Sequence, residues 1–440
     1  MDGVLMMKST SKAGGIEYEF QAPFRAPRDM GHQTKILALD SGMRYLTDLE
    51  HSSSRVFLSR LSNDGTPDLS FAPDGYRTES VEMAFDGLEP GLVVRKDGGV
   101  VAALCNDNEL GLVCFKTDGT LDPDFGTDGI IVHSYWAVGI TQRSGQLDDV
   151  DSDDKSAPSG KDVAGARGTI APGMDGRIYG LIGGRTSSPD AVIRCLGNGE
   201  LDAGFNETGT LPITYTTYDA VVSGVVPTPD GGIAVTGRLR GAVFVSCYKE
   251  DGSLNVQFGE GGFAIFGPEH FGYTDEEILQ LEFNHIAVLP GGGFIVSGYL
   301  SAINPTLTYG LLVAVDSTGK LAQSFNNGKP VMFELAPREV DFIFGGVVLQ
   351  ADGKILVGGG LTARNPTYRR DVFVIRYLQT GELDLSFAGR GWVQFSPFGN
   401  VVSYLNSISI DKDQKILLAG DGGPDNNLSS MTGFVMQLAS

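Results

Sequence analysis

The aspartates of the segment KTDGTLDPDFGTDG, residues 116–129, have a spacing that could serve metal binding or acid chemistry. The carboxylates are those of Asp118, Asp122, Asp124 and Asp128. Carboxylate oxygens gathered in one loop are the ligands that Ca²⁺ prefers. Further copies of the segment, however, replace Asp122 by Asn255 and by Ala322. A calcium loop or a catalytic pair could not lose its carboxylates and keep its chemistry, so the segment predicts a turn.

Six copies of this turn occur along the chain, and each keeps one glycine and one phenylalanine. The phenylalanines, six residues after the glycines, are Phe71, Phe125, Phe205, Phe258, Phe325 and Phe387. Glycine readily adopts the positive φ that such a turn requires, and we expect the phenylalanine to anchor the turn in the core. The aspartates that remain, such as Asp122, are expected to accept hydrogen bonds from turn amides.

Short apolar strands surround each turn in a fixed order. An apolar run, an Asp-Gly or Gly-Gly turn and a second apolar run predict a hairpin, as in VVPTPDGGIAVTG and VVLQADGKILVGG. A third strand precedes each turn and a fourth strand follows it. The chain holds seven hairpins and seven third strands but six fourth strands, and we expect the missing strand at residues 14–23, GGIEYEFQAP.

Repeated four-stranded units of this kind predict an all-β fold, namely a seven-bladed β-propeller of four-stranded antiparallel blades. The N-terminal strand would complete the last blade and close the ring. A right-handed β-helix is the main alternative, but it would need short parallel coils and no Asp-Gly hairpins. We expect residues 14–440 to form one domain, residues 1–13 to be flexible, and the acidic insertion at residues 140–167 to be a flap or disordered.

The turn and hairpin motifs together resemble those of the delta-60 repeat family. Units of that family read approximately as PDGKI, an ARL-type strand and DGSLDxxFGxxG, and the best copies here are residues 229–262 and 351–391. The resemblance covers residues 16–440, although the hairpin pattern decays at residues 40–43 and 411–415. It implies a bacterial β-propeller-like protein, and it implies no settled activity.

The starts of the seven inner strands would meet at the axis of such a ring. They carry Lys35, Glu89, Arg167, Ser223, Asn284, His285, Gly345, Asn406 and Ser407. A metal-assisted hydrolase or lyase would use Glu89, Asn284 and Asn406 as metal ligands. His285 or Glu89 would then be the general base. The ring is poor in carboxylates, and a single channel histidine is more often a hydrogen-bonded wall residue, so this function is the alternative.

Two matching loops, SAINPTLTYG and LTARNPTYRRD, favour a binding function instead. They carry Asn304, Tyr309, Arg364, Asn365, Tyr368, Arg369 and Arg370. Tyrosine offers a flat amphipathic surface, and arginine binds carboxylates through paired hydrogen bonds. The loops therefore predict capture of a small polar ligand or of an acidic segment of a protein partner. A solvated loop with local salt bridges is the other interpretation.

A rim element is predicted between the fourth and fifth hairpins, at residues 268–283. Thr274 and Glu277 have the spacing of a capping box, and an apolar pattern follows them. The segment is therefore expected to form a short helix.

The four cysteines, Cys105, Cys114, Cys195 and Cys247, show no metal-binding spacing. We interpret Cys114, Cys195 and Cys247 as one repeat position of the third strands, where the ring geometry would hold them apart. We therefore expect no disulfides, and small buried side chains at these positions.

The composition restricts the partners and the compartment. The formal net charge is −21, which repels phosphate backbones and anionic lipids, and no apolar stretch is long enough to span a membrane. The start of the chain lacks a secretory core. The default compartment is therefore the cytoplasm, although export without a classical signal would leave no trace. Aspartates of the insertion, from Asp148 to Asp154, are an alternative Ca²⁺ site without EF-hand spacing.

Together these patterns predict a soluble, noncatalytic scaffold that binds a protein or a small polar ligand through its variable loops. Nucleic acid and membranes are not expected as partners, and no cofactor is expected apart from the Ca²⁺ alternative. A metal-assisted hydrolase or lyase at the mouth of the central channel is the alternative function.

Overall fold

The computed structural model describes the chain as β-structure. The described residues are 13–21, 35–39, 41–50, 55–73, 76–83, 89–105, 109–135, 170–183, 189–216, 218–303, 307–334, 340–363, 369–397, 402–423 and 432–440. These segments contain thirty strands and four short 3-10 turns, Met174–Gly176, Pro268–Phe271, Asp275–Glu277 and Asn326–Gly328. No helix within them is long and apolar enough to cross a membrane.

Five separate sheets each have four antiparallel strands in the order of the sequence. The first sheet contains β2 (Lys35–Ala38), β3 (Arg44–Glu50), β4 (Arg55–Leu61) and β5 (Arg77–Ser80). The second contains β6 (Glu89–Val94), β7 (Val100–Cys105), β8 (Glu109–Phe115) and β9 (Ile130–Ser134). The third contains β10 (Ile170–Pro172), β11 (Ile178–Ile182), β12 (Ala191–Cys195) and β13 (Thr210–Pro212). The fourth contains β16 (Val221–Pro227), β17 (Ile233–Leu239), β18 (Ala242–Tyr248) and β19 (Phe263–Phe266), and the fifth contains β20 (Ile278–Val288), β21 (Phe294–Ala302), β22 (Leu307–Val315) and β23 (Val331–Phe333).

The remaining strands form a small hairpin and one eight-stranded sheet. The hairpin is β14 (Thr214–Tyr215) and β15 (Tyr218–Asp219). The large sheet contains β24 (Val340–Leu349), β25 (Ile355–Ala363), β26 (Arg369–Tyr377) and β27 (Trp392–Phe395), followed by β28 (Val402–Ile410), β29 (Ile416–Gly423), β30 (Thr432–Leu438) and β1 (Ile16–Gln21). One parallel bridge, between Arg370 and Val402, joins these two antiparallel sets of four. The prediction of an all-β chain built mostly of four-stranded antiparallel sheets is confirmed.

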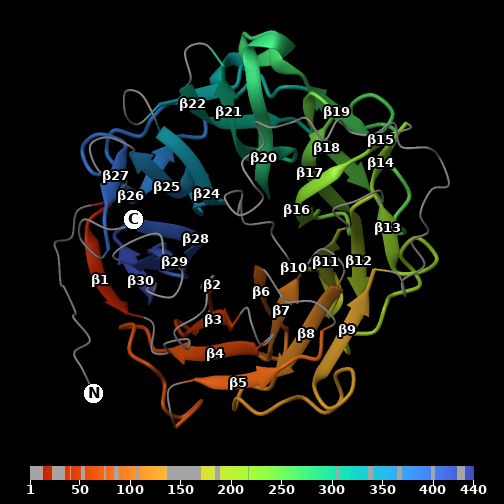
Figure 1. Cartoon of the computed structure of the whole chain (residues 1–440), viewed down its shortest axis with the longest axis vertical. Helices are drawn as coiled ribbons and strands as arrows, with labels where there is room; N and C mark the ends of the chain where they lie inside the picture. Colours follow the sequence, from red (N-terminus) through yellow and green to blue (C-terminus); the bar gives the residue numbers. More distant parts are fainter. Residues whose placement is uncertain are drawn as a thin grey trace.

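The sheets follow one another around a common centre (Figure 1). The strands nearest the centre are β2, β6, β10, β16, β20, β24 and β28. Each of these strands contacts the next, and β28 contacts β2. Buried side chains fill the space between neighbouring sheets, and one cluster unites Val245 of β18 with Phe294 of β21 and Leu311 of β22. The hydrophobic core is therefore distributed between the sheets.

The six turns that follow the third strands link each sheet to the next. Their phenylalanines, Phe71, Phe125, Phe205, Phe258, Phe325 and Phe387, are at most 3% exposed. A phenylalanine packs against the turn glycine of the following unit, and a Cβ added at Gly199 would lie 2.7 Å from the Phe125 ring. The amide after the phenylalanine donates across the same gap, as from Gly126 to the Asn198 carbonyl at 2.9 Å. Packing and hydrogen bonding thus repeat together from sheet to sheet.

Arginines bind the turn aspartates, an interaction that the sequence analysis missed. The ion pairs are Arg60 with Asp68 at 2.8 Å, Arg194 with Asp202 at 2.7 Å, and Arg376 with Asp384 at 2.8 Å. The second carboxylate oxygen accepts a hydrogen bond from a turn amide, as expected. In one such bond, Ser386 N donates to Asp384 Oδ1 at 3.0 Å. Arg194, rather than Cys195, occupies the repeat position of Arg60. The carbonyl of Arg60 and the carbonyl of Arg194 each accept a hydrogen bond from the amide of the turn aspartate. The alignment of Cys195 was therefore wrong by one residue, and all four cysteines are free.

Residues from the two ends of the chain assemble one further turn of this kind. In a continuous turn, the residue after the third strand forms two hydrogen bonds within the turn. The amide of Lys116, for example, donates to the Thr120 carbonyl, and the Lys116 carbonyl accepts from the Gly119 amide. At the chain ends, the Ala439 amide donates to the Gly15 carbonyl at 2.9 Å, and the Gly14 amide donates to the Ala439 carbonyl at 2.7 Å. Gly14 has a φ of 78°, and Phe387 packs against it. The turn forms here without a continuous peptide, next to the pairing of β1 with β30.

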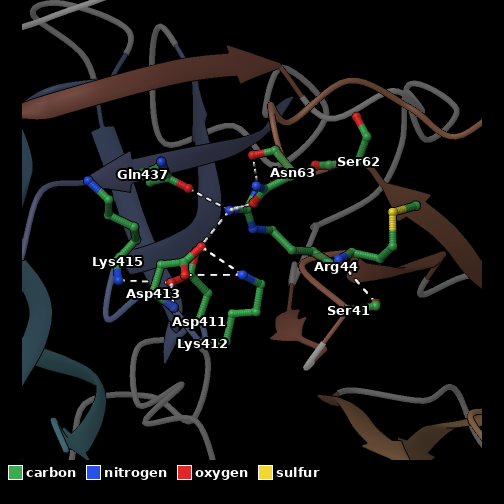
Figure 2. Close-up of polar contacts among 10 residues, drawn as sticks. Ser41, Arg44, Ser62, Asn63, Asp411, Lys412, Asp413, Lys415 and Gln437 are labelled. Atoms are coloured by element: carbon green, nitrogen blue, oxygen red, sulfur yellow. Dashed lines mark hydrogen bonds and ion pairs between the residues drawn. The ribbon is translucent and has the colours of Figure 1, made fainter.

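A buried arginine connects the first sheet to the last (Figure 2). Arg44 begins β3, at the position where the other hairpins have Val100, Ile178, Ile233, Phe294, Ile355 and Ile416. Its guanidinium donates to Asp411 Oδ2 at 3.0 Å and to Gln437 Oε1 at 2.6 Å. The side chains of Arg44 and Asp411 are 1% and 2% exposed. A desolvated ion pair therefore replaces an apolar contact at this junction.

Residues 268–283 differ from the predicted short helix. Two 3-10 turns precede β20, which begins at Ile278. The capping box of Thr274 and Glu277 is present, and the Thr274 amide donates to Glu277 Oε2 at 2.8 Å. The apolar residues after it form a strand because they pair with β21, so long-range pairing prevails over the local helix signal.

Candidate ligand site among the inner strands

Four inner strands carry a β-bulge at corresponding places. The register with the neighbouring strand shifts around Ser223 in β16, Asn284 in β20, Gly345 in β24 and Asn406 in β28. All four residues are among those that the sequence predicts at the axis. A bulge inserts one residue into a strand, bends it and redirects nearby side chains, and bulges are common beside binding sites. The bulges therefore shape the central edge of these sheets.

Glycines on the second strands make room for the bulges. A Cβ added at Gly237, Gly298 or Gly420 would lie 2.0, 1.9 or 1.9 Å from a carbonyl oxygen of the adjacent bulged strand. No side chain tolerates such a distance, so these positions require glycine for close backbone approach. The sequence signal was present as the final glycine of IAVTG, FIVSG and ILLAG. The sequence analysis treated it only as part of the strand.

A cavity of about 190 Å³ lies among the inner strands. Five of its lining residues share one repeat position, four residues before the first residue of the hairpin turn: Lys35, Gly224, His285, Gly346 and Ser407. The two glycines contribute no side chain, so this position presents one ammonium, one imidazole and one hydroxyl. The aliphatic part of the lining is Val225, Ile286, Val347, Val348 and Ile408. The cavity therefore combines nitrogen and hydroxyl groups with an apolar wall.

Hydrogen bonds among β2, β28 and β29 hold Lys35, Asn406 and Ser407 of the cavity in place. Lys35 Nζ donates to the Asn406 carbonyl at 2.7 Å. The Ile36 amide donates to Ser407 Oγ at 3.3 Å. Asn406 Nδ2 donates to Asp421 Oδ2 at 2.8 Å, and Asp421 is 3% exposed. The ammonium and the hydroxyl are thus fixed by neighbouring strands.

The cavity brings together part of the predicted axial set, namely Lys35, His285, Gly345, Asn406 and Ser407. Ser223 and Asn284 are 7% and 6% exposed and do not line it. Arg167 lies outside the described residues, and Glu89 begins β6 with its side chain outside the description. Within the described ranges, no group of three or more His, Cys, Asp or Glu side chains is placed to hold a metal ion. The ligand set of Glu89, Asn284 and Asn406 stays a prediction.

The predicted loop residues are divided between strands and undescribed segments. Asn304, Arg364, Asn365, Tyr368 and the insertion at residues 140–167 lie outside the described residues. Arg369 and Arg370 belong to β26 rather than to a loop. Arg370 is 6% exposed, and its guanidinium carbon lies 4.2 Å from the centroid of the Tyr404 ring, so the loop expected at Arg370 is corrected to a buried strand position. Tyr309 packs 6.3 Å from Tyr273 between ring centroids, and burial raises the pKa of Tyr273 to about 12.

One segment of the sequence matches a known repeat family. A model of the family described as "Domain of unknown function (DUF5122) beta-propeller" matches residues 350–387, which contain the hairpin turn, third strand and phenylalanine turn of one unit. The fold is a β-propeller. No curated protein sequence is significantly similar to the chain.

Solved structures resemble the propeller across nearly its whole length at low sequence identity. The crystal structure of polysaccharide lyase Uly1 is 10% identical with a TM-score of 0.50, covering 92% of this chain and 90% of that chain. A protein of unknown function from Dyadobacter fermentans DSM 18053 is 11% identical with a TM-score of 0.44, covering 96% and 98%. YCF48 bound to D1 peptide is 11% identical with a TM-score of 0.46, covering 99% and 97%. At these identities the likeness concerns the fold alone.

Proposed function

We propose that the protein is a noncatalytic, seven-bladed propeller scaffold. It would bind a small polar ligand in the cavity among the inner strands, which we call the axial cavity. The blades would be the five separate sheets and the two halves of the eight-stranded sheet, with β1 closing the ring. The contacts between successive inner strands and the turn shared by Gly14 and Ala439 support this closure. The turn and hairpin motifs support the assignment of the repeats to the delta-60 family.

The make-up of the axial cavity carries the binding proposal. Side chains from inner strands far apart in the sequence converge there, and Lys35 and Ser407 are each hydrogen-bonded to a neighbouring strand. Preformed cavities with an apolar wall and a few fixed polar groups are typical of small-molecule sites. The volume of about 190 Å³ is below the roughly 300–1,000 Å³ of sites for drug-sized ligands. The expected ligand is therefore small.

The predicted loop residues are part of the same proposal. Tyr309, Arg364, Tyr368 and Arg369 are kept as a second proposed contact surface, distinct from the cavity, for the ligand or a bound partner. Replacing Arg364 and Arg369 together by alanine should then weaken binding, and unchanged binding would remove the loops from the site.

A test of the scaffold begins with the compounds that copurify with the protein. Small molecules released by denaturation would be identified by mass spectrometry and added back to ligand-free protein in calorimetric titrations. We expect one polar compound to bind stoichiometrically and to be recovered unchanged. Val348→Phe, which enlarges a lining side chain, should weaken binding by roughly tenfold or more. Val256→Phe, at a site that is 58% exposed, is the control and should bind normally.

Two results would contradict this proposal. Recovery of a chemically altered compound would show catalysis, and metal analysis would then decide whether the metal-assisted alternative applies. Equal affinity in the Val348→Phe protein would place the ligand elsewhere than in the axial cavity.

A further inference from the structure

We propose that a groove between the fourth and fifth sheets binds a small aliphatic amino acid, at a site separate from the axial cavity. The carboxylate of the ligand would meet Arg238, its ammonium would meet Asp275, and its aliphatic part would contact Leu279. The inference depends on the fixed orientation of this arginine, on the charge balance of the lining, and on a β-bulge that exposes the leucine.

The groove lies where β17 contacts β20, two strands that are neighbours in Figure 1. Its lining comes from the end of β17, the start of β18, the 3-10 turns that precede β20, and the first residues of β20. None of these residues lines the axial cavity. The volume is about 170 Å³, which is below the roughly 300–1,000 Å³ of sites for drug-sized ligands. The groove therefore suits a ligand with one short chain.

Arg238 is oriented by a buried carboxylate. Its Nε lies 3.1 Å from Glu282 Oε1, and its own side chain is 49% exposed. Glu282 is 6% exposed and also accepts a hydrogen bond from Gln280 Nε2 at 3.3 Å, so the group that orients the arginine is itself fixed. Among the described residues Arg238 has no further hydrogen bond or ion pair. Its terminal nitrogens therefore offer the paired donors with which arginine binds a carboxylate.

The charges of the groove favour a zwitterion over a simple anion. Glu282 offsets the charge of Arg238, so this pair offers hydrogen bonds without a net positive charge. Asp275 adds an exposed carboxylate to the lining, and its side chain has no hydrogen bond or ion pair within the described part of the chain. One cation and two carboxylates make the lining net negative. A ligand with an ammonium beside its carboxylate gains the attraction of Asp275, whereas a simple carboxylate is repelled by it.

A β-bulge brings an aliphatic side chain to the groove. The register between β20 and β21 shifts between Ile278 and Gln280, and Leu279, the residue at the shift, is 49% exposed. Bulges redirect side chains and are common beside binding sites. Ile278 and Leu281 also line the groove, where they are partly buried. Contact with an aliphatic ligand would remove this apolar surface from water, so the lining favours an aliphatic body.

Leucine and two of its analogues test the pairing of charges. The analogues are 3-methylbutan-1-amine, which lacks the carboxylate, and 4-methylpentanoate, which lacks the ammonium. Each compound would be titrated into the whole chain by calorimetry at neutral pH and constant ionic strength. We expect leucine to bind and the amine to bind at least about tenfold more weakly, because charge-assisted hydrogen bonds are lost. We expect 4-methylpentanoate to bind at least about threefold more weakly, because an exposed ion pair is lost.

Two substitutions assign the ligand charges to residues. Arg238→Gln should weaken the binding of leucine and 4-methylpentanoate by about tenfold and should not weaken that of the amine. Asp275→Asn should weaken the binding of leucine and the amine by about threefold and should not weaken that of 4-methylpentanoate. Arg240→Gln and Glu276→Gln are the matched controls, because both residues are exposed and neither lines the groove.

Several outcomes would overturn the inference. They are the absence of leucine binding, tighter binding of either analogue, and leucine affinity that Arg238→Gln or Asp275→Asn leaves unchanged. If Arg238→Gln unfolds because Glu282 loses a partner, Asp275→Asn still decides, since Asp275 is exposed. Val348→Phe, in the axial cavity, should bind leucine normally, and loss of leucine binding in that variant would also overturn the inference. Failure of this site leaves the proposed function standing, because the copurifying compound tests the axial cavity.

Discussion

Replacing Arg44 by methionine removes the buried charge between the first sheet and the last. Arg44 and Asp411 are 1% and 2% exposed at the side chain, so the variant leaves Asp411 Oδ2 buried without its cation. Asp411 Oδ1 keeps its bonds from the amides of Asp413 and Lys415, both at 2.9 Å. Loss of one partner of a buried ion pair costs about 3–5 kcal/mol. Methionine restores part of this by apolar burial, so we expect the free energy of unfolding to fall by about 2–4 kcal/mol.

The partner substitution shows whether the loss belongs to the pair. Asp411→Asn removes the charge and keeps an acceptor for the turn amides, and alone it takes the Asp411 charge away from the buried Arg44 guanidinium. The double variant removes both charges, so its loss should be smaller than the sum of the single losses by about 2 kcal/mol or more. Lys412→Met with Asp413→Asn is the control on the same hairpin. That ion pair is 41% and 51% exposed, and its coupling should be about 0–1 kcal/mol.

Urea unfolding at neutral pH, followed by circular dichroism, measures these free energies. The slope with urea must stay unchanged among the variants, because a change would report a different unfolding reaction. A loss below about 1 kcal/mol for Arg44→Met, or strictly additive losses in the cycle, would refute the view that this pair stabilises the junction.

Three further predictions concern the turns and the bulges. Phe387→Ala should lower the free energy of unfolding by about 3–5 kcal/mol. The control Leu385→Ala, at a side chain that is 64% exposed, should change it by less than about 0.5 kcal/mol. Similar losses in the two variants would argue against Phe387 as an anchor of the turn. Gly298→Ala should lower the melting temperature, because the new Cβ would lie 1.9 Å from a carbonyl oxygen, and Gly291→Ala, with nothing within 4 Å, should not. Burial alone would raise the pKa of Asp384, but hydrogen bonds from its turn and the charge of a neighbouring arginine hold it below 3.8. The stability that this carboxylate contributes is therefore complete above pH 3.8 and is lost as pH falls through the lower folded pKa. In acid titrations Asp384→Asn should show a shallower loss, and an identical pH profile would contradict this.

The fold could be predicted because the same local chemistry recurs along the chain. Each turn repeats a glycine and a phenylalanine at fixed spacing, and each hairpin repeats its own turn, so local patterns and tertiary contacts agree. The strand at residues 16–21 was predicted by counting strands alone, and it pairs with β30. Arg44 was overlooked because its partner Asp411 lies far away in the sequence. No feature of the sequence around Arg44 indicates that this charge, at a repeat position that is apolar in the other hairpins, has a counter-ion.

The candidate site was predictable only in outline. Counting from the hairpins placed Lys35, His285 and Ser407 near the axis, and the cavity brings them together. The bulges were not foreseen, because a bulge depends on the register between two strands, and one strand alone does not reveal it. Arg370 was assigned to a loop because it belongs to the insertion LTARNPTYRRD between two strands. Its burial depends on Tyr404, which belongs to a later strand.

The turn shared between Gly14 and Ala439 also bears on the time course of folding. β1 leaves the ribosome ahead of the other described strands, and its partner β30 leaves it last. Every other sheet can pair with strands made shortly before or after, whereas this ladder must bring together segments that are almost a full chain length apart. Until β30 has been made, β1 lacks the strand with which it pairs, and unpaired strand edges are where chains associate wrongly. We therefore expect the docking of β1 on β30 to be a step at which the chain is exposed to aggregation.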